Sequence, residues 1–224
     1  MTSERGWMSV AWDIVRTMML NVQHRGAWMP AGVPDDESEN RLIEWVANNV
    51  DMLRLRVTLL PSAQTSVERH RFLKAFAGKG TTSSHRSFVG SSAGGPVTAA
   101  WPTETHMYKA IRATPRGQVL VCLDSGFPSF EGWACAVRAF NARTGETEIP
   151  LDAGLLAAVE TLLFWDREIG GGAQRGEGRD RIHAPLRDLI AAGLSEDFVA
   201  TYCLALGLHD FLLPKLRNHY QACK

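Results

Sequence analysis

Apolar side chains recur every three or four residues in several stretches of this chain, and each such stretch predicts a helix with one buried face. The first covers residues 4–24. A second begins with Asp36 as its N-cap, and its apolar stripe ends at Leu53. A third begins at a capping box over residues 65–68 and ends at Gly78. The N-terminal part of the chain is therefore expected to be helical.

The C-terminal part shows the same helical periodicity. Asp152 is placed to cap a helix with a wide apolar run, and a glycine-rich segment follows at residues 170–178. Three further helical stretches come after it, one of them with Ser195 as N-cap. This organisation predicts a main domain over residues 1–169 and a C-terminal helical piece over residues 179–224, which could also pack together as one domain.

The middle of the chain lacks helical periodicity. Residues 78–102 are predicted to form a long loop, since they are rich in Gly, Ser and Thr. Gln118–Leu123 and Trp133–Phe140 are β-like, and a turn at residues 143–145 leads to a third short strand that ends at Pro150. These strands predict a small antiparallel β-meander between two helical portions. The expected fold class is α+β and mainly helical.

Composition limits the class of protein. The chain has 224 residues, of which 45% are hydrophobic, enough for one large domain or for one domain with a small appendage. No apolar run approaches the roughly 18 residues of a membrane span, and Glu4 and Asp13 are unlike a signal peptide, so we expect a cytoplasmic protein without membrane contact. The four cysteines are far apart, which indicates reduced thiols. Abundant Ala, Arg, Gly and Trp with few Lys suit a GC-rich bacterial genome.

Charge is distributed unevenly although the net charge is zero. The segment from Arg54 to Arg86 has seven Lys or Arg and one acid, whereas residues 35–44 have five acids and one base. The acids lie at the predicted N-terminus of the second helix, where the helix dipole favours them. The basic segment is suited to a partner rich in phosphate.

Nucleic-acid binding is the leading prediction for this basic segment, because phosphate contacts require Lys and Arg spaced along a surface. Trp101 is an additional candidate for stacking on a base. The residues predicted to contact DNA or RNA are Arg54, Arg56, Arg69, Arg71, Lys74, Lys79, His85 and Arg86.

Protein partners are predicted from tryptophans in loop-like contexts, at Trp28 and Trp133. Together these features predict a non-catalytic subunit of a larger bacterial complex, of a mobile-element, plasmid or defence type. An alternative is an interaction module without nucleic acid, whose acidic residues 35–39 meet a basic partner. The sequence indicates no cofactor and no metal site.

A second alternative is a small serine hydrolase. Residues 90–95 (Gly-Ser-Ser-Ala-Gly-Gly) fit the pattern G-x-S-x-G and resemble the nucleophile segment of the lipases and esterases of the α/β-hydrolase fold. The resemblance covers about six residues. It implies Ser92 as nucleophile, with Asp166 and either His183 or His209 completing a triad.

Two other short motifs were considered. Residues 78–81 (Gly-Lys-Gly-Thr) share part of a phosphate-binding loop but lack the glycine that the motif places five positions earlier. Residues 123–126 (Leu-Asp-Ser-Gly) resemble the segment around the catalytic aspartate of retropepsin-like proteases, which use two such aspartates. A strand that ends in a turn accounts for the same residues.

Overall fold

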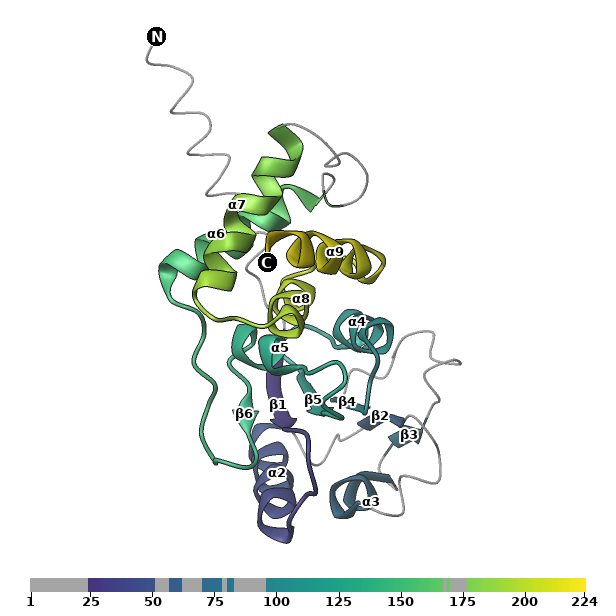
Figure 1. The fold of residues 1–224 in the computed structure, drawn as a ribbon. Coiled ribbons are helices and arrows are strands. Elements are labelled where there is room, and N and C mark those ends of the chain that lie inside the picture. Colours follow the sequence, from purple (N-terminus) through teal and green to yellow (C-terminus); the bar gives the residue numbers. More distant parts are fainter. Residues whose placement is uncertain are drawn as a thin grey trace, which may run out of the picture.

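A sheet of six strands forms the centre of the protein in the computed structural model, which describes residues 24–50, 57–61, 70–77, 80–82, 96–166, 169 and 177–224 (Figure 1). The strand order is β3-β2-β4-β5-β1-β6. The strands are β1 (Arg25–Met29), β2 (Val57–Pro61), β3 (Gly80–Thr82), β4 (Val97–Ala100), β5 (Val119–Leu123) and β6 (Phe140–Asn141).

Every pair of neighbouring strands in this sheet is parallel. The predicted antiparallel meander is therefore wrong, although the chain does combine helices with a sheet. The antiparallel pairing outside the named strands is an isolated bridge between Phe140 and Thr147. Parallel strands need crossover connections, and helices supply them between β1 and β2, β2 and β3, β4 and β5, and β5 and β6.

Helices cover both faces of the sheet (Figure 1). On one face lie α2 (Asp36–Asn49) and α3 (Arg71–Ala77). Leu42 and Val46 of α2 and Phe72 of α3 pack there against Met29 and Val121 from the sheet. On the other face lie α4 (Glu104–Ala113) and α5 (Glu131–Ala136).

The C-terminal helices form a further layer beyond α4 and α5 (Figure 1). They are α6 (Ala153–Phe164), α7 (Glu177–Ala191), α8 (Glu196–Ala205) and α9 (Leu213–Cys223), with a 3₁₀ turn at Asp210–Leu212 before α9. Buried side chains of these helices belong to the same hydrophobic cluster as Trp28, Leu120 and Cys122 of the sheet. The C-terminal helices and the sheet thus share one core.

Arg217 on α9 joins three elements through ion pairs. Its guanidinium donates to Glu104 at 2.6 Å and to Glu196 at 2.9 Å, and its Nη1 lies 2.6 Å from an oxygen of Asp197. Burial alone would lower the pKa of Arg217, but the hydrogen bonds to these carboxylates outweigh burial and raise it. Arg217 therefore fixes α9 against the first turns of α4 and α8.

Several helix predictions are confirmed, although α2 already ends at Asn49 and α3 begins at Arg71, so that His70, which was predicted to be helical, is not. Helices follow Asp152 and Ser195, and both side chains accept hydrogen bonds from the first turn as N-caps. The helix predicted from Asp36 is α2, but its N-cap is Asp35, whose Oδ1 accepts from the Ser38 amide at 2.7 Å. The helix predicted over residues 4–24 lies outside the described residues.

Most of the strand predictions are wrong. Gln118–Leu123 is confirmed as β5, but the first half of the strand predicted at Trp133–Phe140 belongs to α5, and only Phe140 is in a strand, β6. β1 was not predicted, and β3 and β4 lie inside the predicted loop at residues 78–102. None of the described helices combines the length and apolar character needed to cross a membrane.

Candidate functional site

The connections after two adjacent strands leave the sheet on opposite faces. β1 continues to α2 and crosses one face toward β2, whereas β5 continues to α5 and crosses the other face toward β6. The carboxyl ends of β1 and β5 lie side by side, because Met29 pairs with Leu123. Open parallel sheets bind ligands in the gap that such a divergence leaves.

Two cavities open at this edge of the sheet, and Pro30 and Asp124 line both. The larger, here called the acidic cavity, has a volume of about 440 Å³. This volume lies within the range of small-molecule sites, roughly 300–1,000 Å³. The residues that line it are Trp28, Pro30, Ala31, Asp124, Ser129, Glu131, Asn141 and Glu148.

Asp124 follows β5 directly and organises the loop that leads to α5. Its Oδ1 accepts a hydrogen bond from the Gly126 amide at 2.8 Å, and its Oδ2 accepts one from the Phe130 amide at 3.0 Å. Gly126 has a φ of 83°, a conformation that glycine adopts at little cost. Burial raises the pKa of Asp124, and the backbone hydrogen bonds oppose that shift only in part.

Glu148 is held in a fixed position on the other side of the cavity. Its Oε1 accepts hydrogen bonds from Trp28 Nε1 at 3.0 Å and from Asn141 Nδ2 at 2.8 Å. Glu131 begins α5; partial burial raises its pKa, and the negative charges of Glu148 and Asp124 add to the shift. The cavity therefore concentrates negative charge.

No cation among the described residues forms an ion pair with these three carboxylates. Arg143 approaches the loop after β1, where its Nη2 donates to the Val33 carbonyl at 3.5 Å, and its charge acts on Asp35. Within the described ranges, no group of three or more His, Cys, Asp or Glu side chains converges closely enough to hold a metal ion.

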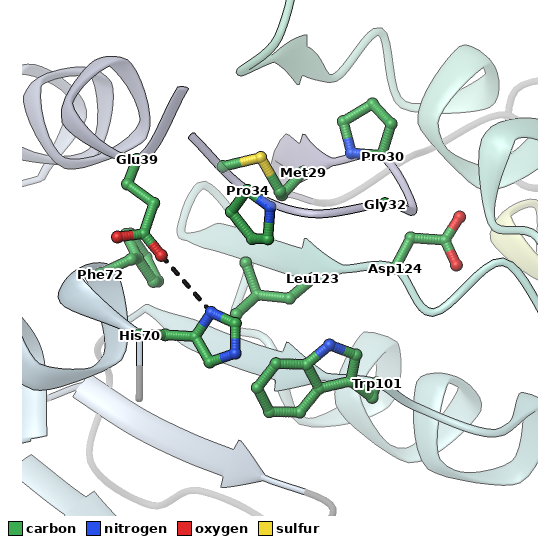
Figure 2. A pocket seen from close by; sticks show the side chains of 10 residues that line it. All are labelled: Met29, Pro30, Gly32, Pro34, Glu39, His70, Phe72, Trp101, Leu123 and Asp124. Atoms are coloured by element: carbon green, nitrogen blue, oxygen red, sulfur yellow. Dashed lines mark ion pairs between the residues drawn. The ribbon is translucent and has the colours of Figure 1, made fainter. Parts of the chain in front are cut away.

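The smaller cavity, about 40 Å³, lies on the side of α2 and α3. Figure 2 shows the Glu39 carboxylate directed at His70, whose Nδ1 is 3.4 Å from Glu39 Oε1. The ring of Trp101 lies 4.7 Å from the His70 ring, and the Asp124 carboxyl group points away from both (Figure 2). Because Pro30 and Asp124 line both cavities, the smaller one adjoins the acidic cavity.

Trp101 has an unusual backbone conformation at this edge. Its φ is 51°, in the left-handed region that residues other than glycine seldom occupy. The conformation directs its amide to the Leu123 carbonyl, to which it donates a hydrogen bond at 2.8 Å. Strain of this kind is concentrated at functional sites in proteins.

The predicted nucleic-acid residues are described only in part. Arg71 and Lys74 are exposed on α3, and Arg71 Nη1 lies 3.4 Å from Asp36 Oδ1. Trp101 is half-buried beside His70. The others lie outside the described residues: Arg54, Arg56, Arg69, Lys79, His85 and Arg86.

Of the residues proposed for the alternative serine hydrolase, the structure describes Asp166, His183 and His209. Ser92 lies outside the described residues, Asp166 is exposed after α6, and His183 is buried on α7. His183 Nε2 lies 3.2 Å from His219 Nδ1 of α9. His209 is within 2.7 Å of the Tyr108 hydroxyl.

The two tryptophans expected at a partner interface are buried. Trp28 is 5% exposed in β1, and Trp133 is 0% exposed in α5. Trp133 packs in the core between the sheet and the C-terminal helices, so its side chain contacts the protein interior. Trp28 instead contributes to the acidic cavity through its bond to Glu148.

Motif-based reasoning missed most of the acidic cavity. Asp124 drew attention only as part of an Asp-Ser-Gly segment, while Glu131, Asn141 and Glu148 were not singled out. The available signal was positional, since Asp124 directly follows an apolar strand, where ligand-binding side chains of parallel sheets are found.

Comparison with known proteins does not add to this picture. The sequence matches no protein-family model, and searches of curated proteins and of solved structures also give no match.

Proposed function

We propose that this domain binds an organic cation, an ammonium or guanidinium group, in the acidic cavity. The observation that supports this most directly is that Asp124, Glu131 and Glu148 line one cavity, while no described cation is ion-paired with them. The position at the divergence of β1 and β5 is independent support, because it follows from topology alone.

Electrostatics favours a cationic ligand over a neutral or anionic one. Burial raises the pKa values of Asp124 and Glu131, and the negative charges of Glu148 and Asp124 raise that of Glu131 further, so like-charge repulsion acts within the cavity. A bound cation would relieve this repulsion and lower both pKa values, whereas a phosphate would add to it.

An organic cation fits better than a metal ion. The cavity is far larger than one ion, and the described acidic side chains do not converge as metal ligands do. A guanidinium presents five N–H donors in a plane and can bond several separated acceptors at once. Glu148 and Asp124 are both held by hydrogen bonds, so they are preorganised for this role.

Isothermal titration calorimetry with agmatine, which carries a guanidinium and an ammonium group, tests the proposal; 1,4-butanediol is the neutral comparison. Saturable binding of agmatine alone is expected. Glu131→Gln should weaken it about tenfold, a loss of about 1.4 kcal/mol. Glu146→Gln is the matched control, because Glu146 is an exposed carboxylate that does not line the cavity.

The proposal fails if agmatine does not bind, if butanediol binds as well, or if the two glutamine variants weaken binding equally. Equal weakening would mean that the general negative charge of this surface, and not the cavity, attracts the ligand.

Contact with a nucleic-acid backbone is a second candidate function. Arg71 and Lys74 are exposed one turn apart on α3, so they present two positive charges on one face. This arrangement supports the prediction of a nucleic-acid-binding subunit within a larger complex.

Fluorescence anisotropy with labelled single- and double-stranded DNA and RNA tests this second candidate. The double variant Arg71→Glu/Lys74→Glu should weaken binding and reduce the slope of log K against log salt by about 2, since about one unit is lost per phosphate contact. Lys109→Glu/Arg112→Glu is the control, because these two residues are also exposed one turn apart, on α4 at the opposite face of the sheet. Equal behaviour of the two double variants would refute a specific role of α3.

A further inference from the structure

Exposed large hydrophobic side chains occur in the segments that line the acidic cavity. Among the described residues, the three most exposed are Val33, Phe127 and Ile149, at 91%, 90% and 82%. Each belongs to a segment that lines the cavity: Val33 follows Pro30 and Ala31, Phe127 lies between Asp124 and Ser129, and Ile149 follows Glu148. These three residues are here called the apolar rim.

The segments that present the apolar rim are held by hydrogen bonds. The Asp124 carboxylate accepts from two amides of the loop that contains Phe127, and Arg143 donates to the carbonyl of Val33 itself. Glu148, next to Ile149, accepts from Trp28 and Asn141. Apolar side chains that are held out into solvent next to a cavity are typical of an interaction surface.

We infer that the cation bound in the acidic cavity is the side chain of a lysine or arginine of a partner protein, whose neighbouring apolar residues cover the apolar rim. The inference rests on the proposed function and specifies its ligand. Charge complementarity selects the basic side chain, and the rim selects a ligand that extends beyond the cavity. A small free cation would fill the cavity but leave Val33, Phe127 and Ile149 in water.

A protein fits this surface better than other large partners do. Nucleic acids and anionic membranes would place phosphates next to three carboxylates. The exposed acids Asp36 and Glu37 in the first turn of α2, directly after the loop that carries Val33, would repel phosphates as well. Arg41 ion-pairs with Glu37 and donates to the Arg143 carbonyl, so its charge is already engaged. Basic side chains in central pockets surrounded by apolar contacts are common anchors of protein interfaces.

The probe for this inference is a fluorescein-labelled peptide with the central sequence Leu-Arg-Leu, compared with the same peptide containing citrulline in place of arginine. Citrulline keeps the shape of arginine but has no charge. The arginine peptide is expected to bind at least about tenfold more tightly than agmatine, and the citrulline peptide at least about tenfold more weakly than the arginine peptide.

The double variant Phe127→Ser/Ile149→Ser should lower the affinity of the arginine peptide to that of agmatine and leave the affinity of agmatine unchanged. Both side chains are exposed, so the fold should be unaffected, and thermal denaturation verifies this. Phe211→Ser is the matched control: Phe211 is also an exposed aromatic residue, but it lies in the turn before α9.

The outcomes separate the two proposals. If agmatine binds but the arginine peptide binds no more tightly, or if the rim variant binds the peptide like the wild type, the partner inference is wrong and the cation site stands. If the citrulline peptide binds as well as the arginine peptide, the rim binds apolar ligands without the cavity, and the inference is again wrong. If neither agmatine nor peptide binds, both proposals fail.

Discussion

Replacing Gly132 with alanine is expected to destabilise the protein by separating α5 from α8. A Cβ atom at position 132 would lie 2.7 Å from Thr201 Oγ1 and 2.8 Å from the carbonyl carbon of Phe198, and closer still to the Phe198 oxygen. Ordinary contacts of carbon atoms are about 3.5 Å or longer, so the helices would have to move apart by about 1 Å.

Neither neighbour can move away easily. The Phe198 carbonyl belongs to the backbone of α8, and the Thr201 hydroxyl donates to the Asp197 carbonyl at 2.8 Å. Overpacking of this kind costs about 1–3 kcal/mol, and we expect the upper end or beyond because the obstacle is backbone. The better helix propensity of alanine returns up to about 1 kcal/mol. The net loss should be about 2–3 kcal/mol, or a fall in Tm of about 4–12 °C for a chain of this length.

Urea and thermal denaturation, followed by circular dichroism, measure this loss. Gly154→Ala is the matched control, since Gly154 is also helical and a Cβ there would contact only the Asp152 side chain, at 3.3 Å. The control should be neutral or slightly stabilising. If Gly132→Ala is within about 0.5 kcal/mol of the wild type, the close approach of α5 and α8 does not contribute as argued.

Three further outcomes are expected from single residues. Arg217→Met should lower the unfolding free energy by about 2 kcal/mol in urea titrations, because three carboxylates lose their shared cation. Arg138 has a φ of 53° and is exposed after α5, so Arg138→Gly should stabilise the protein by about 0.5 kcal/mol, whereas Arg116→Gly, in an exposed turn where φ is not positive, should not. Burial lowers the pKa of His24 from 6.5 to about 4, so the unfolded chain binds more protons in that interval, and stability should fall by up to about 3 kcal/mol as the pH drops through it. His24→Gln should flatten this dependence in denaturation curves between pH 7 and pH 4, and an unchanged slope would assign it to other groups.

Local signals were enough to predict α2, α6 and α8, but they missed α4, and part of α5 was predicted as a strand. Asp152 and Ser195 cap their helices as expected, because capping depends on residues three or four positions apart in the sequence. The error at α2 is one residue, since Asp35 and Asp36 are both good N-caps and only the structure shows which side chain accepts from Ser38. Helix ends are thus readable when a single polar residue stands before the apolar stripe.

The sheet was not predictable in the same way. The described strands β1, β4 and β5 are buried on both faces, so their side chains show no alternation of apolar and polar residues. β1 also contains Gly26, where a Cβ would be only 3.0 Å from the Ala139 Cβ; glycine is a poor strand former, but a side chain would not fit there. Strand direction depends on the crossovers between strands, which no pattern within a strand records.

The acidic cavity had no sequence motif because its charged residues are separated in the sequence. Asp124 follows β5 and Glu131 begins α5 at the end of the same connection, whereas Glu148 follows β6, and the order of strands brings it to the other two. Motif searches favour contiguous residues, and they therefore directed attention to Ser92 and to the basic segment instead.

The charged residues of the acidic cavity do not contribute to the stability of the fold in the way that paired charges do. Burial raises the pKa values of Asp124 and Glu131, and the charges of Glu148 and Asp124 raise that of Glu131 further, so in the absence of a ligand their charged forms are unfavourable in the folded state. Most of the protein shows the opposite arrangement, as where Arg217 neutralises three carboxylates between α4, α8 and α9. Local conflicts that the rest of a structure tolerates are expected at functional sites, because stability is exchanged there for binding. Carboxylates without an ion pair to a described cation, the divergence of β1 and β5 and the apolar rim therefore support the same proposal, that a basic ligand binds at this edge of the sheet.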